Sequence, residues 1–341
     1  MSTYYVDPAA GGLNNGSSWT DAWTSLASAM GLSADDVIYC RGSQTLSAVM
    51  QHTTSGSSGQ PIRFVGCNAS GVEDGTRFTL DGNDGAFDIL DPNACDYIIY
   101  ENFRFTNGGQ DGIDNSTSST AAYWTLINCS VDNCAGIGLN AGYITSIWVL
   151  STFYGNTGDG IDYAASSNVA SLYFCSVHDN GGIGVDCGGY SLSNTVGCLI
   201  FDNGDDGIAS IVGGTGSLLF GSVIDGNADD AVIVGSAAVH TPIFGNRITN
   251  HTAATSIALN VAGLTRGCLI GWNYFENNYG DNVQVGATSI AHRVKVAGTD
   301  TNVEDQSNTN QGYTSLTDGS EDFNLRSDAS VRRTAVQIPL S

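Results

Sequence analysis

The sequence predicts an all-β fold, a parallel β-helix of about 10–11 coils with ~24 residues in each coil, and three observations lead to it. First, an apolar residue recurs after a Gly-rich corner, at successive intervals of 24, 24, 22, 25, 24, 25 and 26 residues. Second, each interval carries about three short apolar runs. Third, none of these runs is long enough for a helix. The recurring residues are Ile113, Ile137, Ile161, Ile183, Ile208, Val232, Ile257 and Val283.

The corners of the repeat are rich in Asn and Gly, as in "NGGQDGID" at 107–114 and "NTGDGID" at 156–162. Asn tolerates the left-handed backbone region and bonds its own neighbours, and Gly has no Cβ to clash there. A second recurring place holds small residues, which we expect to stack inside the coil. These are Cys129, Ser151, Cys175, Cys198 and Ser222.

Residues 1–33 are predicted to form an N-terminal cap, because an open coil exposes unpaired backbone and core. Within "SWTDAWTSLASAM" at 18–30, Ser18 and Asp21 form a capping pattern. Trp19, Trp23, Leu26 and Met30 recur at helical spacing. We therefore expect a short amphipathic helix that covers the first coil, with a surface helix unrelated to the coils as the alternative.

Residues 34–298 are predicted to form the β-helix, in which the first coils are less regular. Beyond them the composition changes, and 299–341 holds few apolar residues but three of the chain's arginines, Arg326, Arg332 and Arg333. We expect this segment to be a tail outside the coils that packs along the β-helix, seals its end or docks on a partner chain.

The charge balance excludes several classes of partner. The formal net charge is −23, with 34 acidic against 11 basic residues, and no Lys or Arg occurs between Arg104 and Arg247. Nucleic acids and anionic membranes need cationic contacts, so neither is an expected partner. Divalent cations and neutral partners suit such a surface better.

The chain starts "MSTYYVDPAAGG", without a basic region or an apolar run, and no apolar stretch reaches the ~18 residues of a membrane span. We therefore expect no signal peptide and no transmembrane segment. The nine cysteines include no C-x-x-C and are expected to be buried in a chain folded in a reducing cytosol.

The opening "YYVDPAAGGLNNGSSWTDAWTSLASA", the N-x-G-D-G-I coils and the late "DFNLRSDAS" resemble right-handed parallel β-helix proteins of the pectate-lyase-like superfamily. The resemblance implies a right-handed, single-stranded β-helix over nearly the whole chain, and the phage virion and tailspike members are the most similar. It leaves the activity open, because this superfamily includes polysaccharide lyases, glycoside hydrolases, phage tailspikes and non-enzymatic surface proteins.

Two enzymatic readings follow from this resemblance. Lyases of the superfamily use a Lys or Arg base beside calcium, and the central coils here contain neither residue. Polygalacturonase-like members carry N-T-D, D-D, G-H-G and R-x-K in that order. "NTGDGID" at 156–162, "GDDGIA" at 204–209 and "RVK" at 293–295 are similar to three of these, but no G-H-G is present.

The candidate site residues are Asp205, Asp206, Asp229 and Asp230, which hold the same place on neighbouring coils. Stacked in register they would lie about 5 Å apart, near the separation of a retaining glycosidase pair, and mutual repulsion would raise one pKa. The same four residues could instead bind a structural calcium ion. The third reading is that Asp is simply a good corner residue, as at Asp111, Asp159 and Asp281.

Aromatic residues give a further lead, because many of them would be exposed on a β-helix. Some must lie in the core, and the others could stack on sugar rings or form an interface. The set is Tyr123, Trp124, Trp148, Tyr154, Tyr163, Tyr173, Tyr190, Trp272 and Tyr274.

These observations favour a non-enzymatic phage virion surface protein: a capsid decoration, spike or fibre component that stabilises the particle or binds a host-surface glycan. We expect a homotrimer that contacts other virion proteins, is made in the host cytoplasm and requires no cofactor. The alternative is a polysaccharide-active glycoside hydrolase that uses the stacked aspartates. A glycan-binding adhesin without turnover is the third possibility.

Overall fold

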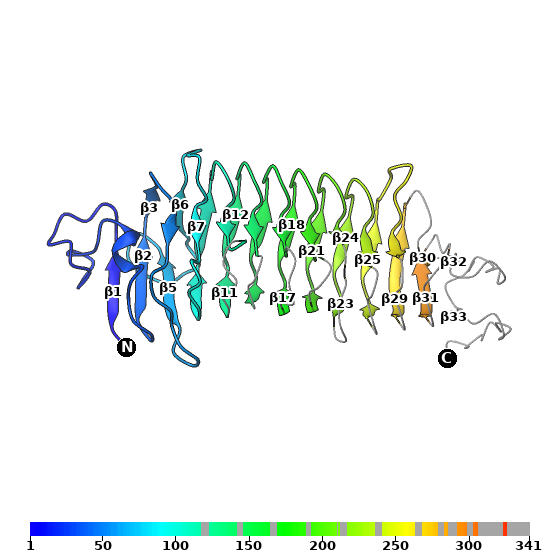
Figure 1. Cartoon of the computed structure of the whole chain (residues 1–341), viewed down its shortest axis with the longest axis horizontal. Coiled ribbons are helices and arrows are strands. Elements are labelled where there is room, and N and C mark those ends of the chain that lie inside the picture. The colour runs from blue at the N-terminus through cyan, green and yellow to red at the C-terminus, as the bar shows by residue number, and fades with distance from the viewer. Residues whose placement is uncertain are drawn as a thin grey trace. The chain divides into compact units, whose positions relative to one another are not determined.

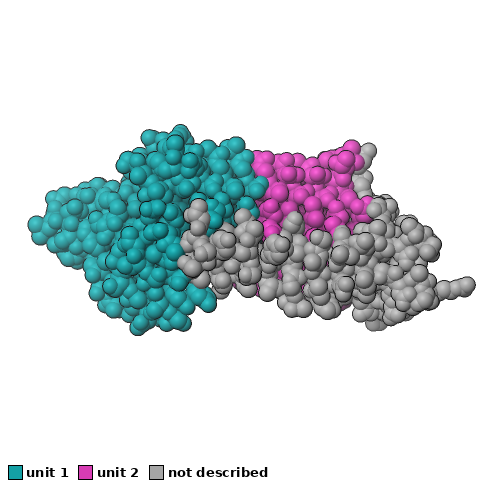
Figure 2. Space-filling view, viewed as in Figure 1, with its two compact units in different colours: residues 1–164 teal, residues 165–341 magenta. Residues whose placement is uncertain are grey.

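The computed structural model describes residues 1–116, 123–141, 146–163, 169–188, 192–209, 211, 217–235, 241–262, 268–278, 283–285, 292–298, 303–305 and 323–325. The chain divides into two compact units, Met1–Ala164 and Ala165–Ser341 (Figure 2). In each unit, successive turns of the chain add strands to three faces, which we call face 1, face 2 and face 3, and neighbouring strands of a face run parallel (Figure 1). The predicted all-β parallel β-helix is therefore confirmed.

In the first unit, every pairing between the strands of successive coils is parallel. Face 1 consists of β1 (Thr3–Val6), β2 (Val37–Arg41), β5 (Ile62–Cys67), β8 (Ile98–Glu101), β11 (Trp124–Ile127) and β14 (Ser146–Val149). Face 2 consists of β3 (Ser43–Thr45), β6 (Phe78–Asp81), β9 (Phe103–Thr106), β12 (Ser130–Asp132) and β15 (Thr152–Tyr154). Face 3 consists of β4 (Met50–Gln51), β7 (Leu90–Asp91), β10 (Ile113–Asp114), β13 (Leu139–Asn140) and β16 (Ile161–Asp162).

The second unit repeats this arrangement. Face 1 consists of β17 (Val169–Tyr173), β20 (Leu192–Val196), β23 (Leu218–Phe220), β26 (Pro242–Phe244) and the starts of β29 (Leu269–Glu276) and β31 (His292–Gly298). Face 2 consists of β18 (Ser176–His178), β21 (Leu199–Phe201), β24 (Val223–Asp225), β27 (Arg247–Thr249) and the ends of β29 and β31. Face 3 consists of β19 (Val185–Asp186), β22 (Ile208–Ala209), β25 (Val232–Val234), β28 (Leu259–Val261), β30 (Val283–Val285) and β32 (Val303–Asp305).

Two of the three corners of each coil lie at the ends of the face 2 strands. Corner 1, between faces 1 and 2, turns at a residue with positive φ, such as Asn102 and Asn128 in the first unit and Gly197 and Gly221 in the second, and residues 68–77 lengthen it between β5 and β6. Corner 2, between faces 2 and 3, begins with another positive-φ residue, often Asn, and continues through the Gly-rich segment. Asn and Gly occupy these places because they enter the left-handed region at low cost.

The core column on face 3 differs from the predicted one at three positions. Ile113 pairs with Leu139, which pairs with Ile161, and in the second unit Val185, Ile208, Val232, Leu259 and Val283 pair in sequence. Ile137, Ile183 and Ile257 were expected in this column but lie two residues earlier, at corner 2, and are only half-buried. The apolar spacing alone does not distinguish a corner residue from a strand residue two places later.

The predicted helix at 18–30 is wrong over most of its length. The described helix is a four-residue 3-10 turn, η1 (Leu26–Ala29), capped by Ser25. Trp23 instead forms a bridge with Val6, its N–H donating to the Tyr5 carbonyl and its carbonyl accepting from Asp7 N–H. These tertiary hydrogen bonds override the helical propensity, and the predicted cap is not confirmed.

The C-terminal segment contains two described strands. β32 pairs in parallel with β30, and β33 (Phe323–Leu325) pairs antiparallel with β31. The three tail arginines lie outside the described residues, so the domain boundaries and the docking role remain predictions. Within the part of the chain that the structure describes, no helix is long and apolar enough to cross a bilayer.

Candidate functional site

The candidate aspartates lie at corner 2 of two successive coils in the second unit, directly before β22 and β25. Asp206 and Asp230 are 8% and 6% exposed, whereas Asp205 is exposed and Asp229 is half-buried. Each of Asp206 and Asp230 precedes a small residue and an inward-facing Ile or Val. The sequence correctly predicted that the two pairs share one place in the coil.

The buried carboxylates bind the backbone of the following coil. Oδ1 of Asp206 accepts a hydrogen bond from the N–H of Asp230 at 2.9 Å. Oδ1 of Asp230 accepts one from the N–H of Ile257, and its Oδ2 accepts one from the Asn260 amide at 2.9 Å. Both Asp230 oxygens therefore have structural hydrogen-bond partners.

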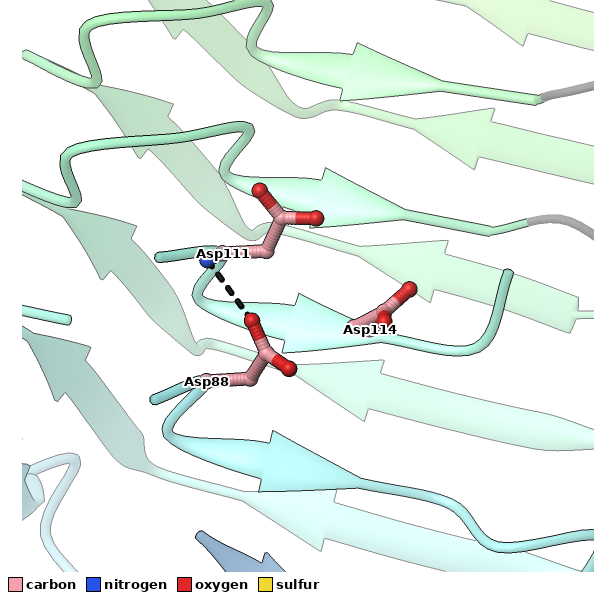
Figure 3. A group of neighbouring side chains, drawn as sticks. All are labelled: Asp88, Asp111 and Asp114. Carbon is pink, nitrogen blue, oxygen red and sulfur yellow. Dashed lines mark hydrogen bonds between the residues drawn. The ribbon is translucent and has the colours of Figure 1, made fainter. Parts of the chain in front are cut away.

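The first unit contains the same arrangement (Figure 3). Oδ1 of Asp88 accepts from the N–H of Asp111 at 2.9 Å, and Asp111 accepts from the N–H of Ile137 at 2.7 Å and from the Asn140 amide at 3.0 Å. On the coil after Asp111 the equivalent corner position is occupied by Ile137, and on the coil after Asp230 it is occupied by Ile257. An Asp at this corner therefore recurs as a hydrogen-bond acceptor that joins its coil to the next one. The next coil can carry an apolar residue at the equivalent position.

Burial changes the acidity of these groups. It raises the pKa of Asp206 to about 7, and the neighbouring carboxylates of Asp230 and Asp205 act in the same direction. Burial also raises the pKa of Asp230, although the hydrogen bonds from Asn260 and Ile257 favour its charged form. In the first unit, burial raises the pKa of Asp88. The predicted rise at one stacked carboxyl is thus present at Asp206, where desolvation contributes more than repulsion.

Two groups of carboxylates have the spacing to share a cation. Asp205, Asp206 and Asp229 offer oxygens that all lie within 4.8 Å of one another, as do those of Asp88, Asp111 and Asp114. Asp230 was expected in the first group, but its carboxylate is directed to Ile257 and Asn260 instead. Calcium prefers six to eight oxygen ligands, so three carboxylates would supply part of a shell.

The other segments similar to polygalacturonase motifs are distributed over both units. Asn156 and Asp159 belong to the first unit, where Asn156 is buried and its Oδ1 accepts from the N–H of Cys134 at 3.1 Å. Asp206 belongs to the second unit. Arg293 and Lys295 belong to β31, whose side chains lie outside the described residues.

The aromatic candidates include buried and exposed residues, and Tyr154 and Tyr173 are half-buried. Trp124 and Tyr163 are in the core, whereas Tyr123, Trp272 and Tyr274 are exposed. Trp148 and Tyr190 lie among the residues whose side chains are not described. Sequence reasoning missed Phe174 and Phe220, which are 60% and 49% exposed, and half-buried Phe244. Their alternation with buried Cys175, Leu219 and Ile243 was the signal that could have identified them.

No protein-family model matches this sequence, and no curated protein matches it significantly. Among solved structures, pectate lyase Pel9A matches with a TM-score of 0.63 and 18% identity, over 89% of this chain and 78% of that one. An alginate lyase from Paenibacillus sp. str. FPU-7 matches with a TM-score of 0.56 and 14% identity, over 82% of this chain and 98% of that one. The right-handed, pectate-lyase-like β-helix fold is therefore shared.

A viral protein has the same fold. Geobacillus virus E2 ORF18 matches with a TM-score of 0.58 and 11% identity, over 86% of this chain. The aligned region spans 57% of the viral chain. At these identities the likeness concerns the fold, which carbohydrate-active enzymes and this viral protein have in common.

Proposed function

We propose that this chain is a non-enzymatic surface protein of a phage-type virion, a capsid decoration, spike or fibre component that stabilises the particle and binds glycan. The observation that carries the non-enzymatic part is the bonding of the buried aspartates. Asp206 and Asp230 accept main-chain hydrogen bonds from the next coil, as Asp88 and Asp111 do in the first unit. Because the same hydrogen bonds between coils occur in both units, they give these aspartates a structural role that requires no catalysis.

The viral part of the proposal is supported by the fold of Geobacillus virus E2 ORF18 and by the charge balance. A chain with a net charge of −23 is repelled by anionic polymers, which suits a role other than cleaving an acidic polysaccharide. The proposal includes self-association as a homotrimer and contacts with other virion proteins.

The test is to look for the chain in virions. Particles purified from the host that carries the gene should react with an antibody against the chain, and immunogold labelling should decorate their surface. The purified protein should release no reducing ends from polygalacturonate, alginate or uncharged glycans. Absence of the chain from purified particles would overturn the viral assignment.

A glycoside hydrolase is the second candidate, favoured by the acidity of Asp206. A carboxyl with a pKa of about 7 is protonated often enough at neutral pH to act as a general acid, and Asp205 and Asp229 lie beside it. If reducing ends are released, Asp206→Asn should abolish the release while Asp88→Asn, at the equivalent place in the first unit, should leave it unchanged.

We further propose that any bound calcium is held by Asp205, Asp206 and Asp229, whose oxygens all lie within 4.8 Å of one another. Calorimetric titration with CaCl₂ would then show binding that Asp229→Asn weakens. A flat titration, with no shift of the melting temperature on chelation, would remove calcium from the proposal.

A further inference from the structure

Corner 1 of the second unit carries an apolar strip that the core does not need. We call it the corner stripe and define it as Phe174, Leu199, Phe220, Phe244, Trp272 and Tyr274. Phe174, Leu199, Phe220 and Trp272 are about half exposed or more, and Tyr274 is 37% exposed. Their immediate neighbours Cys175, Ile200, Leu219 and Phe275 are buried, so strand alternation directs the stripe residues outward.

The stripe takes residues from successive coils, and some of them are in register. Phe220 on β23 pairs with Phe244 on β26, which pairs with Gly271 beside Trp272. On the other side of the corner, Arg247 on β27 pairs with Tyr274. Neighbouring strands in a sheet lie about 4.8 Å apart, so the stripe presents apolar groups with this repeat along the coils.

The aromatic rings are supported by glycines of the next coil. A Cβ placed on Gly197 would lie 2.7 Å from Cδ1 and Cε1 of Phe174, and one on Gly271 would lie 2.6 Å from Cε1 of Phe244. The rings of Phe244 and Trp272 are 5.6 Å apart between centroids. Because the rings are already packed, a ligand that covers them loses little side-chain entropy on binding.

The charges around the stripe select against anionic ligands. Arg247 is the nearest described cation, and its guanidinium pairs with the Glu276 carboxylate at 3.4 Å. The rest of the chain carries a large negative charge. Anionic polymers would therefore be repelled from the stripe at low salt.

The size of the stripe argues against a second copy as its occupant. A stable protein interface uses about 20–30 residues on each side, several times the number in the stripe. A carbohydrate needs less, since an aromatic ring offers a flat apolar surface to the C–H face of a sugar. Arg247 and Glu276, beside Tyr274, can exchange hydrogen bonds with hydroxyl groups.

We propose that the corner stripe binds an uncharged polysaccharide that runs along the coils, with successive sugars over successive coils. This inference rests on the proposed glycan-binding role and deepens it by naming the ligand class and the surface. The acidic corner 2 is not part of this site, since it lies at the other end of the face 2 strands.

The test uses the full-length protein in affinity gel electrophoresis, with mixed-linkage β-glucan, galactomannan or dextran in the gel and polygalacturonate as the anionic comparison. We expect at least one uncharged polymer to retard the protein. Trp272→Ser and Phe220→Ser should each weaken that retardation about tenfold or more, which corresponds to about 1.4 kcal/mol. The matched control is Tyr123→Ser, which removes an exposed ring of the first unit and should change nothing.

Several outcomes would overturn the inference. These are no retardation by any of the three uncharged polymers, equal retardation of wild-type protein and both stripe variants, and retardation by polygalacturonate alone. Sedimentation velocity covers the competing occupant, because oligomers that Trp272→Ser dissociates would assign the stripe to a second copy. Circular dichroism of each variant verifies folding. Virion labelling is read separately, so loss of glycan binding with intact labelling rejects the stripe alone.

Discussion

The two units have the same coil but differ in where their aromatic rings lie. The first unit has many rings in its interior, and most of the described rings of the second unit lie toward its surface. In the first unit Phe64, Tyr100, Phe103 and Trp124 form an interior cluster, with Phe64 and Tyr100 stacked at 4.8 Å. Among the described residues of the second unit, Phe275 is the one aromatic ring among the largest fully buried side chains. Its other described rings lie toward the surface, Phe174, Phe220 and Trp272 among them.

The interior of the second unit is filled differently. Aliphatic residues share it with a ladder of buried amides, in which Asn180 donates to Asn203 at 2.9 Å and Asn203 donates to Asn227 at 2.8 Å. Each ladder amide satisfies its neighbour, so the buried polar groups have low cost. Since the described interior of the second unit is filled largely without rings, the exposed rings of the corner stripe are not part of its core.

Corner 1 shows the same contrast. In the first unit it is polar on two successive coils, where Asn128 donates to Oδ1 of Asn102 at 2.7 Å and receives the Arg77 guanidinium, and an apolar residue, Leu150, is exposed there on the coil after them. In the second unit the equivalent corner holds glycines and Phe174 and Trp272. Four comparisons of variants test whether these differences change the free energy of unfolding and its pH dependence as expected.

The largest expected effect is the loss of an interior ring. Trp124→Ala should destabilise the protein by about 3–5 kcal/mol, because it leaves a cavity and removes the indole hydrogen bond to the Cys95 carbonyl. Trp272→Ala, in the stripe, should change the free energy of unfolding by less than about 1 kcal/mol. Urea unfolding measures both, and similar losses would contradict the division between core and surface rings.

The second effect is acid lability. Burial lowers the pKa of His52 to about 3, below its usual 6.5, so the folded state resists a proton that the unfolded state accepts. The stability that neutral His52 provides is complete above pH 6.5 and decreases as the pH falls toward 3, by up to tenfold in the unfolding constant per pH unit. His52→Phe should remove this loss between pH 6.5 and 4.5, measured by urea unfolding at each pH.

In the second unit, His251 takes an Asn place in the ladder, with its Nε2 3.3 Å from the Asn227 amide and its pKa lowered to about 4 by burial. His251→Asn should restore the ladder and reduce acid lability. Asp206 acts in the opposite sense, since its raised pKa stabilises the protonated folded state below pH 7. Hydrogen exchange of the two units should therefore show the greater acid loss in the first, and the reverse order would contradict this reading.

The third effect compares two ion pairs. Arg104 binds the fully buried Asp132 through Nε and Nη2, at 2.9 and 2.6 Å, whereas Arg247 meets Glu276 at 3.4 Å in solvent. Arg104→Ala should cost about 1–3 kcal/mol, because Asp132 keeps only the hydrogen bonds from Thr106 and Asn133. Arg247→Ala should cost about 0–1 kcal/mol. Equal melting-temperature shifts for the two variants would contradict the comparison.

The smallest effect concerns the acidic corner. Asp206→Asn keeps an oxygen that can accept the Asp230 N–H and removes a charge that burial disfavours. The folded pKa of Asp206 is about 7 and its unfolded pKa is about 4, so the penalty of burying its charge grows as the pH rises from about 4 and is complete above about 7. By urea unfolding, we expect the variant to gain about 1 kcal/mol at pH 8, and this gain should shrink to nothing as the pH falls below about 4. Asp205→Asn, at an exposed carboxylate, is the control and should stay within about 0.5 kcal/mol.

Much of the architecture was predictable because the residue pattern repeats with the period of the coil. The parallel β-helix, the positive-φ Asn at Asn107 and Asn133, and the stacked small residues Cys198 and Ser222 followed from spacing and side-chain size. The alignment of Asp206 with Asp230 followed from the same period.

Other features were not predictable from spacing. Ile183 and Val185 are both apolar and two residues apart, so only strand pairing shows that Val185 shares a column with Ile208. Asn203 and Asn227 were expected at corners and instead turn inward to form the ladder. The segment at 18–30 has helical periodicity, yet Trp23 bonds to Tyr5 and Asp7 in place of a helix.

The sequence by itself determined that the chain coils, how long a coil is and which residue types form its corners, because these properties repeat and need no knowledge of distant contacts. Only the tertiary structure decided where each side chain points. A shift of one residue reverses inside and outside in a strand. That choice makes Asp230 a connection between coils and leaves Phe220 and Trp272 on the surface.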